Sequence, residues 1–366
     1  MDTADILRMR LSRQLVDSSS ATTPHDVASR LLAMQAQDYA GSLWSVGVRL
    51  PGTVLADVER AIAERSIVRT WPMRGTLHLV AAEDVRWMLP LLTPRVIARA
   101  ASRAAQLGLT DDTFARARVL FAEALGGGRQ LTRPQAMALL EADGIPTAGQ
   151  RGYHILWRLS QEGLLCCGPM DGKQQTFVLL DEWISPGPSE RDRPPRDEAL
   201  ARLAARYFAG HGPATLEDFA WWSGLAKSDA QAGLEAQVEP LACAEVDGRR
   251  YWWLEENADS SSAGPAMGVH LLPGFDEYML GYTDRSLQLA EHLEAYGSSV
   301  SANGMFSATL VIDGRIAGTW KRALKRDRVE IAVRAFRHLG KAEVIGLAEA
   351  ADGYGAFVGL PPVVHR

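Results

Sequence analysis

Apolar and polar positions follow a regular order between residues 130 and 184. Thr132 is a helix-capping residue, and Pro134 follows in the first helical turn, where its missing N–H costs nothing. The periodicity predicts helices over 134–142 and 147–162, followed by strands over 164–167 and 175–180. Helix, tight turn, helix and β-hairpin form the winged-helix variant of the helix-turn-helix, whose second helix enters a DNA groove.

The same order of predicted elements occurs twice more. Downstream, the pattern predicts helices over 197–210, 216–222 and 228–237, then strands over 241–246 and 250–254. Toward the N-terminus it predicts helices over 4–17, 24–34, 43–48 and 54–65, strands over 67–71 and 76–80, and helices over 83–105 and 111–125. We therefore expect three tandem winged-helix modules, at 1–128, 129–188 and 196–257.

The pattern changes from residue 268 onward, where apolar and charged residues alternate in short strands predicted over 307–312, 315–321 and 328–335. Such alternation is typical of a sheet with one wet face. The proline-rich stretch 185–188 and the small polar stretch 259–265 are typical of linkers. The predicted fold class is α+β: three winged-helix modules followed by a small C-terminal β-barrel-like domain at 266–366.

The composition is that of an ordinary globular protein of 366 residues, 47% hydrophobic and 23% charged. No run approaches the roughly 18 apolar residues that span a membrane, and no secretory signal is visible. Cys166, Cys167 and Cys243 fit a reducing compartment and lack zinc-ligand spacing. We expect a cytoplasmic monomer without a metal, a cofactor or a membrane partner.

The net charge of −5 disfavours a nucleic-acid binder, which usually carries a basic balance. The positive charges are, however, clustered. One cluster comprises Arg315, Lys321, Arg322, Lys325, Arg326, Arg328, Arg334, Arg337 and Lys341, and the other comprises Arg95, Arg99 and Arg103. A solvated surface explains either cluster separately, and the two together suit a protein with one basic face and an acidic back.

The run Gln35-Ala36-Gln37-Asp38 is the most informative candidate for chemistry. Glutamine is a poor acid and base, but its amide donates and accepts hydrogen bonds at once, which suits a site that holds a water molecule. The alternative is a polar helix end with solvated amides. Because residues i and i+2 diverge on a helix but share a side of an extended segment, cooperation between Gln35 and Gln37 requires a position at a helix end.

Four segments spread over the chain then resemble a known family. They are Met34-Gln35-Ala36-Gln37-Asp38-Tyr39, Arg69-Thr70-Trp71-Pro72-Met73-Arg74-Gly75-Thr76-Leu77-His78, His211-Gly212-Pro213-Ala214-Thr215 and Leu271-Leu272-Pro273-Gly274-Phe275-Asp276-Glu277-Tyr278. The chain resembles the bacterial winged-helix DNA glycosylases that unhook bulky alkylation damage, the group of the azinomycin-resistance glycosylase. The resemblance implies three tandem winged helices with a C-terminal β-barrel, and a catalytic signature matched by Gln35 and Gln37.

The resemblance implies a monofunctional glycosylase that releases bulky or cationic N7- or N3-alkylpurines from double-stranded DNA. It also implies unhooking of interstrand crosslinks and self-resistance to a genotoxic natural product. A cationic purine is a good leaving group, so two amide carbonyls that place water and stabilise positive charge suffice. Asp38 supplies a charge or a proton acceptor, unless it is a helix-end carboxylate bonded to backbone. A bulky adduct does not fit a base-flipping pocket, so we expect an inserted hairpin or loop to help.

Further residues are candidates for supporting or DNA-binding roles. Arg74 contacts phosphate or orients the glutamines, unless it forms a buried salt bridge. For His78 we expect a hydrogen-bonded structural role, and the same holds for Asp276 and Glu277, on a loop that helps close the site. The remaining DNA-binding candidates are Gln150, Arg151, His154, Arg158, Lys321, Arg322, Lys325 and Arg326. The first four are phosphate contacts unless their helix packs inward.

Two other functions remain open from the sequence. The runner-up is a non-enzymatic winged-helix DNA-binding or regulatory protein, although no sensor or dimerisation segment is evident. The third is a scaffold that binds protein through its winged helices. Release of an alkylated base from duplex DNA separates the glycosylase from both.

Overall fold

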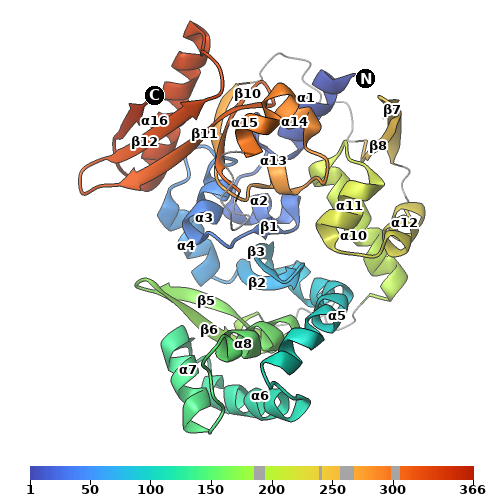
Figure 1. Cartoon of the computed structure of the whole chain (residues 1–366), viewed down its shortest axis with the longest axis vertical. Coiled ribbons are helices and arrows are strands. Elements are labelled where there is room, and N and C mark those ends of the chain that lie inside the picture. The colour runs from blue at the N-terminus through green and yellow to red at the C-terminus, as the bar shows by residue number, and fades with distance from the viewer. Residues whose placement is uncertain (185–193, 239–240, 256–267, 298–305) are drawn as a thin grey trace.

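A computed structural model of the chain describes residues 1–184, 194–238, 241–255, 268–297 and 306–366. The two predicted linkers, 185–188 and 259–265, lie outside these described residues. Within them, no helix combines the length and the apolar character needed to cross a membrane. The elements form four successive groups along the chain (Figure 1).

The first group surrounds a short strand, β1. It comprises α1 (Thr3–Arg13), α2 (Pro24–Leu31), β1 (Met34–Gln35), α3 (Tyr39–Gly47), α4 (Leu55–Ala63), β2 (Ile67–Met73) and β3 (Thr76–Ala81). Thr23 caps α2 and Asp26 completes a reciprocal capping box. Helix α2 is shorter than the predicted 24–34, because Leu32 adopts a positive φ of 64° and turns the chain into β1.

The second group contributes to the same sheet as the first. It comprises α5 (Ala82–Gln106), α6 (Asp111–Leu125), β4 (Leu131–Thr132), α7 (Arg133–Ala142), α8 (Arg151–Gln161), β5 (Leu165–Asp171), β6 (Gln174–Leu179) and α9 (Leu180–Trp183). The strand order is β1-β3-β2-β5-β6-β4, and Arg69 pairs with Cys167 where β2 meets β5. The two hairpins predicted in separate modules therefore form one six-stranded sheet.

The third group is a helical cluster with a hairpin. It comprises α10 (Arg196–His211), α11 (Leu216–Ser223), α12 (Lys227–Glu235), β7 (Ala242–Val246) and β8 (Arg249–Trp253). Thr215 caps α11 and Gly224 ends it in the left-handed conformation, at φ 73°. The order of elements agrees with the prediction for this stretch. The identity of the three groups as winged helices, and the limits of the domains, stay predictions.

The fourth group contains a second sheet. It comprises β9 (Val269–Leu272), α13 (Glu277–Leu280), α14 (Ser286–Leu289), a 3₁₀ helix (Ala290–His292), α15 (Leu293–Gly297), β10 (Ala308–Ile312), β11 (Arg315–Leu324), β12 (Val329–Ala335), α16 (Lys341–Val358) and β13 (Pro362–His365). Its order is β13-β12-β11-β10-β9, with β13 parallel to β12. Strands β9 and β13 do not pair with each other in the described ranges, so the predicted barrel is corrected to a half-barrel, against which α16 packs.

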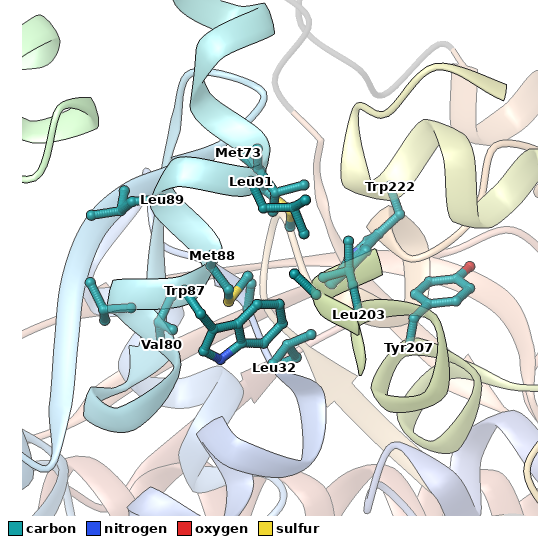
Figure 2. Close-up of a cluster of buried hydrophobic side chains, with 14 of the residues drawn as sticks. Leu32, Met73, Val80, Trp87, Met88, Leu89, Leu91, Leu203, Tyr207 and Trp222 are labelled. Atoms are coloured by element: carbon teal, nitrogen blue, oxygen red, sulfur yellow. The ribbon is translucent and has the colours of Figure 1, made fainter. Parts of the chain in front are cut away.

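Two hydrophobic cores cross the predicted domain limits and meet at β1. Figure 2 shows part of the first, in which Leu32 lies near Trp87 and Met88 of α5, opposite Leu203, Tyr207 and Trp222 of α10 and α11. The second core joins Met34 and Ala36 to the C-terminal sheet and α16. Leu32 and Ala33 thus enter one core, whereas Leu31, Met34 and Ala36 enter the other, which fixes the chain at the start of the Gln35-Ala36-Gln37 motif.

Candidate active site

Gln35 and Gln37 lie on an extended segment between α2 and α3. Strand β1 pairs with β3 so that Gln35 faces His78, and the ladder continues with a 2.7 Å bond from Ala36 N to Leu77 O. Ala36 is buried, Gln35 half-buried and Gln37 exposed. Because side chains alternate on an extended chain, the two glutamines leave it on the side opposite Ala36. The geometric requirement of the motif is met.

Both glutamine carbonyls are held by long hydrogen bonds. Gln35 Oε1 accepts from Arg74 Nη2 at 3.4 Å, and Gln37 Oε1 accepts from the main-chain N–H of Leu77 at 3.4 Å. A side-chain carbonyl has two lone pairs, so each retains one acceptor site. The two amides are therefore oriented by the protein and still able to bind a water molecule.

Arg74 connects Gln35 to helix α11. Arg74 lies in the β2–β3 turn and has a positive φ of 53°. Its Nη1 donates to the carbonyl of Trp222 at 2.7 Å, and the guanidinium carbon lies 5.1 Å from the ring centre of Trp221. Burial lowers the pKa of Arg74, and the neighbouring Glu277 carboxylate opposes that shift. This half-buried arrangement, tied to Trp222 and Gln35, favours the orienting role over phosphate contact.

His78 is a neutral acceptor beneath this arginine. Its Nδ1 lies 2.9 Å from the carbonyl of Thr76, to which it donates, so Nε2 is free to accept from Arg74 Nη2 at 3.3 Å. Burial, reinforced by the charge of Arg74, lowers the pKa of His78 to about 3. The imidazole is therefore neutral at physiological pH, in the hydrogen-bonded structural role expected for it.

Glu277, the first residue of α13, is fully buried beside Gln35. Its Oε1 accepts the main-chain N–H of Gln35 at 3.0 Å, and its Oε2 accepts the indole N–H of Trp222 at 2.9 Å. His211 Nε2 lies 3.4 Å from the same Oε2. Burial raises the pKa of Glu277, but the contacts with His211 and the charge of Arg74 outweigh it and lower the pKa to about 2. The carboxylate is ionised at neutral pH.

Asp276 has a different environment from its neighbour. Its two carboxylate oxygens bind the guanidinium of the buried Arg49 at 2.8 Å each, and one also accepts from Ser45 Oγ at 2.7 Å. It also accepts the main-chain N–H of Tyr278 at 2.9 Å, which starts α13. Asp276 thus anchors α13 to α3, as the predicted structural role requires.

Asp38 is exposed and paired with a cation that the sequence assigns to DNA. Its Oδ2 lies 3.1 Å from Arg322 Nη2 on β11, and its side chain makes no capping bond to α3. The backbone-bonded alternative is therefore wrong, and Arg322 is engaged within the protein. Lys321, Lys325 and Arg326, the other candidates near the β11–β12 turn, are exposed, and Lys325 lies 3.5 Å from Glu330.

The four candidates on α8 are tied to neighbouring segments. Arg151 donates to the carbonyls of Pro146 and Leu107, and Arg158 pairs with Glu162. Gln150 accepts from Arg103 at 3.0 Å, while the His154 ring lies between those of Tyr153 and Trp157. Burial, with the charge of Arg103, lowers the pKa of His154. These four residues thus have partners within the protein, while Gln150 is exposed and the other three are half-buried, and their contact with DNA stays a prediction.

Sequence reasoning missed several residues of the site. Arg69 donates to the carbonyl of Ala36 at 3.1 and 2.8 Å, which fixes the middle of the motif. Trp222 and His211 bind Glu277, and Arg49 binds Asp276. Arg69 and His211 stand inside the family-like segments, whereas Trp222 and Arg49 stand outside them and carry no local signal.

Comparison with known proteins identifies the family of this chain. The family model described as DNA glycosylase AlkZ-like matches residues 28–357. An interstrand DNA cross-link repair glycosylase of Streptomyces sahachiroi is 30% identical over 329 residues, 86% of each chain. The structure of Streptomyces sahachiroi DNA glycosylase AlkZ is similar with a TM-score of 0.81 at 26% identity, over 100% of this chain and 99% of that chain. The chain therefore belongs to the AlkZ-like DNA glycosylase family and is an enzyme of that class.

Proposed function

We propose that this glycosylase hydrolyses the N-glycosidic bond of cationic N7- or N3-alkylated purines in double-stranded DNA, with Gln35 and Gln37 holding the attacking water. The observation that carries the proposal is that both amides stand just before α3 and are each held through one carbonyl bond, Gln35 by Arg74 and Gln37 by the main-chain N–H of Leu77. Such a pair orients water without needing a strong base, because the leaving group is already activated by its charge.

The reaction balances without a cofactor. The bond between the anomeric carbon and purine N9 breaks, and its electron pair neutralises the cationic base as it departs. The water oxygen forms the new bond to the anomeric carbon and its proton passes to solvent. The amide dipoles of Gln35 and Gln37 stabilise the positive charge that develops on the sugar, so the contribution of the protein is placement and electrostatics.

The accessibility of the motif supports action on large adducts. Gln37 is exposed and Gln35 half-buried, so the sugar can approach without the base entering a deep pocket. The relative that is 30% identical carries the name of an interstrand cross-link repair glycosylase. We extend that substrate class to this chain, since a base joined to the opposite strand cannot be flipped fully into a pocket.

We further propose that the three winged-helix modules, at 1–128, 129–188 and 196–257, grip the duplex together with the basic β11–β12 hairpin. Figure 1 shows this hairpin projecting from the C-terminal half-barrel. Lys321, Lys325 and Arg326 are exposed along it. A chain with a net charge of −5 needs such a local concentration of cations to bind phosphates.

The test is release of base from defined duplexes. DNA carrying N7-methylguanine, a bulky N7 adduct or an N7 crosslink is incubated with the protein, and abasic sites are counted. We expect abasic product from the wild type and none from the double variant Gln35→Ala/Gln37→Ala, whereas Gln130→Ala, at an exposed glutamine outside the site, retains activity. Salt-dependent DNA binding without base release from any cationic purine would overturn the proposal.

A further inference from the structure

Four residues, Gln35, Glu277, Trp222 and Arg74, form a closed ring of hydrogen bonds. Glu277 accepts the main-chain N–H of Gln35 at 3.0 Å and the indole N–H of Trp222 at 2.9 Å. Arg74 donates to the main-chain carbonyl of Trp222 at 2.7 Å and to Gln35 Oε1 at 3.4 Å. The ring joins β1, the β2–β3 turn, α11 and α13, which belong to three of the four groups of elements.

The two charged residues hold different parts of Gln35. Glu277 fixes its main chain, whereas Arg74 fixes its side-chain carbonyl, and both also bind Trp222. Glu277 is fully buried, so its bonds are shielded from water and its position is set by the packing around it. Displacement of the carboxylate would therefore move the Gln35 backbone and, through Trp222, the guanidinium that orients the Gln35 amide.

The ring also sets the charge beside the reacting sugar. Glu277 places a buried anion near the half-buried cation of Arg74, and each shifts the pKa of the other toward the ionised form. Loss of the anion alone would leave a guanidinium bonded to Gln35, next to a sugar that becomes positively charged. That uncompensated cation opposes the transition state in a site of low dielectric.

We propose that Glu277 is a positioning residue for base excision, which acts by holding Gln35 through this ring and by balancing the charge of Arg74. The proposal rests on the proposed role of Gln35 in placing water. Asp38 neither holds Gln35 nor balances the charge of Arg74, because its carboxylate is exposed and paired with Arg322.

The first variant is Glu277→Gln, which keeps the size of the side chain and removes its charge. A glutamine carries an NH₂ group in place of one carboxylate oxygen, so it can accept only one of the two N–H groups that Glu277 accepts. The NH₂ group would then face another donor, either the Gln35 N–H or the Trp222 indole N–H. We expect the single-turnover excision rate to fall about 100-fold, the loss typical of a misplaced catalytic group, while the Kd for duplex DNA is unchanged. Trp222→Phe, which opens one bond and keeps both charges, should cause a smaller fall.

A double-mutant cycle distinguishes positioning from general destabilisation. If Glu277 acts through Gln35, Glu277→Gln costs less rate in a Gln35→Ala background than in the wild type, and the cost that remains is that of the uncompensated Arg74 charge. The matched control is Asp84→Asn, a fully buried carboxylate that accepts a tryptophan N–H at 2.9 Å but contacts Trp87 rather than the site. Any loss of rate caused by Asp84→Asn should be independent of Gln35, so in the double variant the fold losses of Asp84→Asn and Gln35→Ala should multiply. Adding Trp222→Phe to Glu277→Gln removes one facing donor and should restore part of the rate.

Hydrogen exchange of the Gln35 main-chain amide provides a readout that does not require activity. Glu277→Gln, and more weakly Trp222→Phe, should speed this exchange, whereas Asp84→Asn should not. An unchanged Gln35 amide, or an equal loss of rate with and without Gln35, would overturn the proposal. If wild-type protein releases no base, the proposed function fails, and the exchange measurement still decides whether Glu277 holds Gln35.

Discussion

The carboxylate of Asp38 pairs with the guanidinium of Arg322, with 3.1 Å between Oδ2 and Nη2. The pair joins the N-terminus of α3, directly after Gln37, to strand β11 of the half-barrel. The ion pair holds the Asp38 carboxylate toward β11. The acid next to the motif therefore suits a role in holding β11 against the active site better than a role as general base.

This pairing predicts a mild effect for Asp38→Asn. The excision rate should fall by less than about tenfold, equivalent to about 1.4 kcal/mol of activation free energy. Gln37→Ala, in contrast, should cost about 100-fold, the loss typical of a removed transition-state dipole. Single-turnover formation of abasic sites measures both rates. An Asp38→Asn variant as slow as Gln37→Ala would restore Asp38 as a base.

The buried pair of Arg49 and Asp276 predicts a large effect on stability. Both side chains are at most 1% exposed, and they form two bonds of 2.8 Å. Asp276→Ala leaves the Arg49 cation buried without its partner, which should lower the free energy of unfolding by about 4 kcal/mol.

The control is the exposed pair of Glu217 and Lys227 on the surface. Glu217→Ala should lower the free energy of unfolding by less than about 1 kcal/mol, because solvent screens the pair. Urea unfolding measures both variants. Equal losses would show that Arg49 finds other acceptors, for which Gln14 and Ser45 are the neighbours at hand.

Most local elements could be predicted because their signals are local. Thr132 caps its helix where the sequence places it, and the hairpins follow from turn residues between apolar runs. Strand β1 was missed because its two residues become a strand only by pairing with β3. Helix α16 was missed because it contains three glycines among small residues, which blur the helical period.

The candidate site likewise contains residues that the sequence indicates and residues that it does not. Gln35 and Gln37 could be found because they form a short motif with its own geometric requirement. The sequence predicts only a structural role for Glu277. Its contact with Gln35 joins residues 242 positions apart, so no local pattern indicates it. The pairing of β2 with β5 likewise depends on how two hairpins dock against each other. The alternation of apolar and polar residues along each hairpin predicts its strands but not this docking.

His78 predicts how stability depends on pH. Its pKa is about 3 in the folded protein against 6.5 for the free side chain, so between these values the unfolded state binds a proton that the folded state does not. Its contribution is complete above pH 6.5 and is lost as the pH falls toward 3. At pH 5 the loss should be about 2 kcal/mol of unfolding free energy.

Urea unfolding at pH 7.5, 6 and 5 measures this dependence. In His78→Asn the slope of unfolding free energy against pH should be smaller by the contribution of one proton. His270, whose pKa burial lowers to about 4, contributes a parallel slope that remains in both proteins. Identical slopes for the wild type and His78→Asn would mean that His78 is protonated in the folded state, which would remove the acceptor that holds Arg74.

The salt dependence of DNA binding distinguishes Arg326 from Arg158, although the sequence assigns both to DNA. Arg326 is exposed in the β11–β12 turn, whereas Arg158 is paired with Glu162 and lies 5.2 Å from the ring centre of Phe114. A phosphate contact by a protein cation releases a counterion from the DNA into solution, which contributes about −0.9 to the slope of log K against log salt. Arg326→Ala should reduce the slope by about that amount, and Arg158→Ala should leave it unchanged. The reverse result would mean that α8 turns outward to bind DNA and that the Glu162 pair breaks on binding.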